Sequence, residues 1–328
     1  MPPATPPYHD PPGWDGNIPV LCVAVTPCLQ RILKIDGLEA GRVNRARSTV
    51  LTVGGKAVNA ARALAALGGR ALLTGFSGGV NGDRMRSLLD RMGIAHKFVP
   101  SRGETRICTT LFDESRGGVT EIVEEGPVPT GKELQSLYGK FAALLPRCGM
   151  AIAAGALPPG CQEDAYGRVA EKAAAAAVPF LLDTHGPALF KALPFAPLLV
   201  KCNRGEMART FRRALESDTD LLAAARDLSP RGARWVLVTD GSRPAFLAGE
   251  GEAWQFVPPA VKVLNSVGSG DSCTAGIAHA LSLGRPMPEA VRFGMACGAA
   301  NATTLEPGDI SPTAVLRLLR KTRLRPLG

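Results

Sequence analysis

The stretch NSVGSGDSCTAG, residues 265–276, places one carboxylate, Asp271, directly after a loop with almost no side chains. The loop residues Gly268, Ser269 and Gly270 run into small residues that begin a helical pattern. The first N–H groups of a helix lack intrahelical acceptors, and glycines let an anion approach them closely. We therefore predict an anion site at this loop, with Asp271 placed to take a proton from an attacking hydroxyl. The alternative is an ordinary glycine-rich turn with Asp271 as N-cap, because the loop matches neither a Walker A loop nor a GxGxxG fingerprint.

The chain around this loop alternates helical patterns with short apolar runs from about residue 52 onward. Runs such as RALLTGF, MAIAAG, PFLLD, PLLVK and RWVLVTD are typical of strands covered on both faces. Stretches such as AVNAARALAALG and QEDAYGRVAEKAAAAA have helical patterns. The alternation predicts a parallel sheet in an α/β layer fold.

Two stretches, about 31–51 and 96–124, break this alternation. Both look like successive strands joined by turns, with apolar residues that partly alternate with polar ones, as in a sheet with one wet face. We predict that they form a small β layer beside the main body. Residues 1–18 are rich in proline and predict an extended, poorly ordered tail, which leaves 19–328 as the folded domain.

Composition excludes several classes of protein. The 328 residues contain no apolar run long enough for a transmembrane helix, and the N-terminus lacks the pattern of a secretory signal. The eight cysteines form no CxxC pair, so we expect reduced thiols in a cytoplasmic protein. The net charge is +9, and the last eighteen residues hold five basic residues and no acid. A solvated helix end explains this better than nucleic-acid binding, because no recognition motif accompanies it.

The segment LVKCNRGEMART offers a second candidate site. Asn203 and Glu206 lie three residues apart at an expected helix start, where they could orient a water shell around Mg²⁺. Lys201 would then face nucleotide phosphates. The alternative is structural, because Asn as N-cap with Glu at the third helical position is a variant of the capping box.

Two further segments carry candidate acceptor-binding residues. In VGGKAVNAARALAALGG, Gly54 and Gly55 permit a tight turn, so that Lys56 could bind a phosphate and Asn59 a hydroxyl. In GETRICTTL, Arg106 could form a forked contact with a phosphate. The alternatives are a solvated lysine beside a turn and a surface arginine on a strand.

The order of these segments resembles the ribokinase-like sugar kinases of the PfkB family, most closely the branch of 1-phosphofructokinase and tagatose-6-phosphate kinase. The resemblance runs from about residue 20 to 320 and includes EAGRVNRA, GALPPG and LLDTHGPAL beside the segments above. It implies a three-layer α/β/α, Rossmann-like domain with a β-sheet lid that often supports a homodimer. It also implies ATP and Mg²⁺ as cofactors and transfer of a γ-phosphoryl group to a sugar hydroxyl.

The resemblance also assigns residue roles. It implies that Asp271 is the catalytic base, and that the amides of Gly268, Ser269 and Gly270 form the anion hole. The remaining implied contacts are with ATP, its metal and the acceptor: Lys201, Asn203, Glu206, Thr239, Gly241 and Asn301 for ATP and magnesium, and Gln30, Gly54, Gly55, Lys56, Asn59 and Arg106 for the sugar phosphate.

The departures from the family pattern lie on the acceptor side. Gln30 stands where the family has an Asp that holds sugar hydroxyls, and Ala154 and Ala156 replace two hydroxyl-bearing residues. Because Lys56 and Arg106 would have little to pair with on a neutral sugar, we expect a phosphorylated ketohexose as acceptor. Two alternatives stay open: a kinase of an unphosphorylated sugar or nucleoside, and a catalytically inactive sugar-phosphate sensor.

Overall fold

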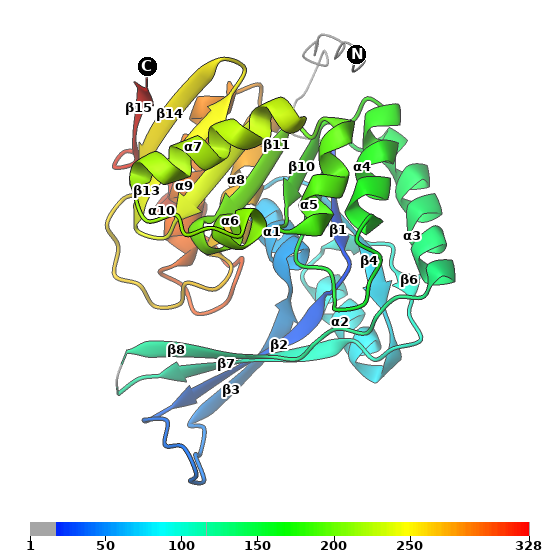
Figure 1. Cartoon of the computed structure of the whole chain (residues 1–328). Coiled ribbons are helices and arrows are strands. Elements are labelled where there is room, and N and C mark those ends of the chain that lie inside the picture. Colours follow the sequence, from blue (N-terminus) through cyan, green and yellow to red (C-terminus); the bar gives the residue numbers. More distant parts are fainter. Residues whose placement is uncertain (1–17, 116, 328) are drawn as a thin grey trace.

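The computed structural model describes residues 18–115 and 117–327, so the predicted tail at 1–17 lies outside it. A large sheet forms the centre of the main body, with helices on both faces, and a small second sheet projects from one side (Figure 1). Along the large sheet the strand order is β15-β14-β13-β12-β11-β10-β9-β1-β4-β5, and β6 also pairs with β4. Its strands are β1 Val20–Ala24, β4 Ala71–Ser77, β5 Ala95–His96, β6 Val99–Pro100, β9 Met150–Ala154, β10 Phe180–Asp183, β11 Leu199–Asn203, β12 Trp235–Asp240, β13 Arg243–Gly249, β14 Glu252–Val257 and β15 Arg323–Leu327.

Successive side chains of a strand point to opposite faces of the sheet, so each face has its own apolar side chains and its own layer of helices. In β1, Cys22 and Ala24 join one core cluster while Leu21 and Val23 join the other. The first cluster includes residues of α1 Lys56–Ala66, α2 Gly79–Arg91, α8 Ser269–Ser282, α9 Met287–Asn301 and α10 Pro312–Leu319. The second includes residues of α3 Gly131–Leu144, α4 Ala165–Ala175, α5 Pro187–Ala192, α6 Arg204–Phe211 and α7 Asp218–Leu228. The three-layer α/β/α prediction is therefore confirmed.

The small sheet has the order β3-β2-β7-β8. It consists of β2 Cys28–Ile35, β3 Ser48–Gly54, β7 Arg106–Asp113 and β8 Gly118–Val123. The chain passes from β1 into β2 through three residues and from β3 into α1 through Gly55 alone, so this sheet is anchored to the main body at both places. We call it the lid; it extends away from the main body in Figure 1.

Two expectations need correction. The large sheet is parallel only as far as β12, because β12, β13, β14 and β15 pair antiparallel. The basic C-terminal segment is not only a helix end: after α10 it forms β15, which pairs with β14 at the edge of the sheet. Across the described ranges, 18–115 and 117–327, no helix combines the length and apolar character needed to cross a membrane.

Candidate active site

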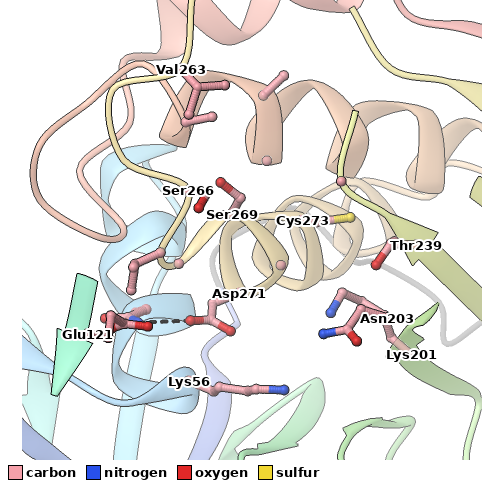
Figure 2. Close-up of a pocket in the computed structure, with 18 of the residues that line it drawn as sticks. Lys56, Glu121, Lys201, Asn203, Thr239, Val263, Ser266, Ser269, Asp271 and Cys273 are labelled. Atoms are coloured by element: carbon pink, nitrogen blue, oxygen red, sulfur yellow. Dashed lines mark hydrogen bonds between the residues drawn. The ribbon is translucent and has the colours of Figure 1, made fainter. Parts of the chain in front are cut away.

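A cavity of about 760 Å³ is lined by residues of the lid and of the main body. Most of the predicted site residues line it, although they come from distant parts of the sequence: Gln30, Gly55, Lys56, Asn59, Arg106, Lys201, Asn203, Glu206, Thr239, Gly241, Gly268, Ser269, Gly270 and Asp271. In the view of Figure 2, Asp271 lies between Glu121 and the pair Lys201 and Asn203, with Lys56 below it. Gly54 and Asn301 do not belong to the lining.

Asp271 is a buried carboxylate at the start of α8. Gly268 is the N-cap of this helix, with a φ of 81° that favours glycine, and Asp271 lies in the first turn. One carboxylate oxygen accepts a 2.8 Å hydrogen bond from Asn59 Nδ2 of α1. Burial, helped by the negative charge of Asp183, raises the pKa of Asp271 to about 6. Asp271 is therefore a carboxylate at neutral pH whose basicity exceeds that of an ordinary aspartate.

The loop before Asp271 presents its backbone to the cavity. Within the described chain the Ser269 N–H already donates to the Ser266 carbonyl at 3.2 Å, so the open donors at this helix end are the amides that follow it. A Cβ on Gly270 would lie 3.2 Å from Lys201 Nζ, which places the ammonium against the loop. An anion at this point would meet helix amides and a lysine together.

Asn301 supports the loop through hydrogen bonds and is not part of the cavity lining. Its amide donates to the Val267 carbonyl at 2.8 Å, and its oxygen accepts from the Gly308 amide at 2.7 Å. With 1% of its surface exposed, Asn301 is fully committed to these contacts. The ATP contact that the resemblance implies for Asn301 stays a prediction.

Asp183 is the important site residue that the sequence analysis missed. It ends β10, is completely buried, and accepts hydrogen bonds from Lys201 Nζ and, at 2.7 Å, from Lys56 Nζ. Burial alone would raise the pKa of Asp183, but the two lysines outweigh it and hold that pKa well below the usual range. Parallel strands bring their carboxyl ends to one edge of a sheet, so an acid at the end of the run PFLLD was the available signal.

Asn203 and Glu206 form the capping box that we considered as the structural alternative. Glu206 N–H donates to Asn203 Oδ1 at 2.8 Å, and Asn203 N–H donates to Glu206 Oε2 at 2.9 Å. The other oxygen of Glu206 accepts from Lys56 Nζ at 2.6 Å. The cap fixes both side chains, and both residues line the cavity.

Lys56 lines the cavity, as expected for a phosphate-binding residue, but its ammonium group already forms ion pairs with two carboxylates. It contacts both Asp183 and Glu206. Burial lowers the pKa of Lys56, but these two carboxylates outweigh burial and raise it well above the usual range. The charge of Asp271 also raises the pKa of Lys56, so these two side chains lie close together.

At the lid end of the cavity, Gln30 is buried and donates to Thr110 Oγ1 at 2.8 Å. A side chain at Gly54 would come within 2.9 Å of Gln30 Oε1, so Gly54 makes room for Gln30 without lining the cavity. Arg106 donates to the Glu124 carbonyl at 2.8 Å and to the Thr26 carbonyl at 3.0 Å. Its Nε is buried and has no partner among the described residues.

The opposite end of the cavity is apolar. Its lining there comes mainly from the segment after β14 and from α9: Pro258, Pro259, Ala260, Val261, Met295, Ala299 and Ala302. Thr239 in β12 and Gly241, just after the end of this strand, also line the cavity. The sequence analysis did not find the apolar segment, because an irregular proline-containing loop has no periodic pattern.

Comparison with known proteins decides the family. The model of the pfkB family carbohydrate kinases matches residues 20–314. The chain belongs to this family. PfkB kinases use ATP to phosphorylate a hydroxyl of their substrate, so the chain is an ATP-dependent carbohydrate kinase.

Solved structures agree with this family assignment. Phosphofructokinase-2 from Escherichia coli in complex with potassium is 26% identical, with a TM-score of 0.86, over 93% of this chain and 99% of that one. The possible 1-phosphofructokinase from Thermotoga maritima is 23% identical, with a TM-score of 0.87, over 94% and 100%. Ribokinase from Arabidopsis thaliana is 21% identical, with a TM-score of 0.73, over 93% and 99%. The last two similarities concern the fold alone.

Proposed function

We propose that this PfkB kinase transfers the γ-phosphoryl group of ATP to a hydroxyl of a phosphorylated ketohexose, with Asp271 as general base. The observation that carries the proposal is the position of Asp271, a buried carboxylate with a pKa of about 6 in the first turn of α8. A base placed there takes the proton from the acceptor hydroxyl, while the open helix amides beside it stabilise charge on the transferring group. Lys201 and Lys56 lie close to this site, and both form ion pairs with Asp183.

The residues present fit ATP and a hydrated Mg²⁺. The apolar end of the cavity suits a nucleotide base, and the lysines and loop amides suit its phosphates. Among residues 18–115 and 117–327, no group of three or more acidic, histidine or cysteine side chains could hold a metal directly. Asn203 and Glu206 therefore fit a metal held through its water shell, which Mg²⁺ retains readily. Bound Mg²⁺ would neutralise charge on the phosphate oxygens.

The phosphorylated acceptor is supported by Arg106 and by one structural relative. The Nε of Arg106 is buried without a partner in the described chain, at the lid end of the cavity. The E. coli phosphofructokinase-2, 26% identical to this chain, has been solved in complex with fructose-6-phosphate. Lys56 gives less support than the sequence suggested, because two carboxylates already share its charge.

Glu121 favours a second candidate, a kinase of an unphosphorylated sugar or nucleoside. Its carboxylate lines the lid end of the cavity, opposite Thr110 across β7 and β8. Burial raises the pKa of Glu121, and the charge of Arg106 only partly offsets this effect. A carboxylate there would accept hydrogen bonds from hydroxyl groups and would disfavour a phosphate beside it. Glu121 also supplies on β8 the carboxylate that Gln30 lacks on β2.

Two further features belong to the proposal. All eight cysteines are free thiols, which supports a reducing compartment such as the cytoplasm. Ile122 and Val123 on β8 are exposed by 56% and 54%, which supports a homodimer formed through the lid. Sedimentation of the wild type against Ile122→Lys tests the dimer, and an unchanged mass would contradict it.

The first experiment on function is ADP release with Mg-ATP against fructose-1-phosphate, fructose-6-phosphate, tagatose-6-phosphate, free hexoses and nucleosides. Turnover of one phosphorylated ketose supports the main proposal, and Arg106→Gln should then raise KM most strongly. Turnover only of a neutral acceptor supports the second candidate, for which Glu121→Gln should raise KM instead. ATP binding without turnover of any acceptor would contradict both and favour the sensor.

A further inference from the structure

Two cysteine thiols face the cavity from adjacent strands of the lid. Cys28 in β2 and Cys108 in β7 both line it, with 1% and 5% of their surfaces exposed. The parallel register pairs Cys28 with Arg106 and Gln30 with Cys108, so the two cysteines are diagonal neighbours on one face of the lid. Phosphoryl transfer, as derived above, has no use for either thiol.

The surroundings of Cys108 favour its thiolate. The neighbouring Cys28 side chain, the charge of Arg106 and the backbone of Glu124 all lower the pKa of Cys108. Burial and the Glu121 carboxylate oppose them. The net effect lowers the pKa of Cys108 to about 7, while the pKa of its partner Cys28 is raised well above the usual range. A thiolate is the nucleophilic form of cysteine.

The other cysteines lack these surroundings. Burial raises the pKa of Cys161, which is only partly covered and lies outside the cavity lining. Burial likewise raises the pKa of each remaining thiol: Cys22, Cys148, Cys202, Cys273 and Cys297. At neutral pH these side chains are therefore protonated thiols.

We propose that Cys108, assisted by Cys28, is a thiol-modification site inside the cavity and that small disulfides are the class of reagent it takes. The Cys108 thiolate attacks one sulfur of the disulfide, forms a mixed disulfide, and releases the other half as a thiolate. No further oxidant is needed, and a thiol reductant reverses the step. The adduct projects from β7 into the lid end of the cavity. This inference does not depend on which acceptor the kinase uses, because its readout is adduct formation.

The test uses the folded full chain and the neutral reagent 2-hydroxyethyl disulfide, with adducts located by peptide mass spectrometry. We expect Cys108 to be modified first in the wild type and the adduct to disappear with dithiothreitol. Cys108→Ser should remove the fast phase, and Cys161→Ser, the matched control, should retain it. First modification at Cys161 or Cys28, or no fast phase in the folded wild type, would overturn the proposal.

The role of Cys28 is tested by comparing Cys28→Ser, which keeps a hydrogen-bond donor, with Cys28→Ala, which does not. If Cys28→Ala returns the Cys108 pKa to about 8.5, adduct formation becomes about sixfold slower at pH 6 and about threefold faster at pH 9. The reversal arises because a more basic thiolate is scarcer at low pH but intrinsically more nucleophilic. Cys28→Ser should stay near the wild type at both pH values. Equal rates for Cys28→Ala and the wild type at pH 6 would refute the assisting role.

Discussion

Replacing Asp271 by Asn should abolish most turnover and stabilise the fold at the same time. The change removes the base but preserves the shape of the side chain, and the new amide oxygen can still accept from Asn59 Nδ2. A positioned base contributes about 10²–10⁴-fold to rate, so we expect kcat to fall by that factor. ATP affinity should change little, because the loop amides and Lys201 stay in place.

The stability gain follows from the pKa of Asp271. The carboxylate ionises near pH 6 in the folded protein and near about 3.9 in an unfolded chain. Ionisation therefore costs the folded state about 3 kcal/mol above pH 6, and this cost disappears below about pH 4. Asp271→Asn should recover much of it at pH 7.5 and lose the advantage at pH 4.

The assay combines ADP release with chemical denaturation of the same variants at both pH values. Glu133→Gln is the matched control, because Glu133 is a buried carboxylate of the α3 capping box, remote from the cavity lining. Burial opposes ionisation of Glu133, but hydrogen bonds from Thr130 and Arg102 outweigh it and lower its pKa, so its loss should reduce stability and leave kcat unchanged. An Asp271→Asn variant that turns over within tenfold of the wild type, or that is less stable at pH 7.5, refutes the assignment.

Three other predictions concern the same site. The kcat/KM profile should rise with pH through about 6, as Asp271 loses its proton, and a flat profile between pH 5 and 8 would contradict the role of Asp271. Asp183→Asn leaves Lys56 and Lys201 without their common anion and should destabilise the fold by about 3–5 kcal/mol in urea titrations, whereas Asp309→Asn at an exposed position should change far less. Gly268→Ala should lose turnover, because a Cβ there would lie 2.7 Å from Pro307 Cβ and φ is 81°. Gly284→Ala, with φ at 73° and open space around it, should lose about 1–2 kcal/mol of stability but keep its turnover.

The sequence predicts the main body well because strand and helix periodicities are local. The run RWVLVTD, for example, becomes β12 over Trp235–Asp240, and PFLLD becomes β10 over Phe180–Asp183. The antiparallel edge was missed, because β13 and β14 form a hairpin and β15 is a short, charged strand whose pairing depends on residues about 70 positions away. The composition of β15 resembles that of a solvated basic tail, so composition alone did not reveal a strand at the sheet edge.

The sequence predicted most residues of the candidate site but not which of their side chains contact one another. Lys56 and Glu206 were each found from their own segments, yet their direct contact spans 150 residues and follows only from the strand order. The resemblance assigned Asn301 to ATP, but nothing in the sequence indicated its contacts with Val267 and Gly308. Pairwise geometry of this kind depends on the tertiary fold.

The proposed acceptor-binding groups and the proposed groups for phosphoryl transfer lie mostly on different sheets of this kinase. This separation bears on how substrate choice can change within such a fold. Gln30, Arg106 and Glu121, three of the groups proposed to contact an acceptor, belong to the lid. Asp183, Lys201 and Asp271, the groups around phosphoryl transfer, all belong to the main body. We therefore expect that an exchange such as Asp to Gln at position 30 changes the lid contacts and leaves Asp183, Lys201 and Asp271 in place. On this proposal, substitutions in the four lid strands can change the substrate while the groups for phosphoryl transfer stay unchanged.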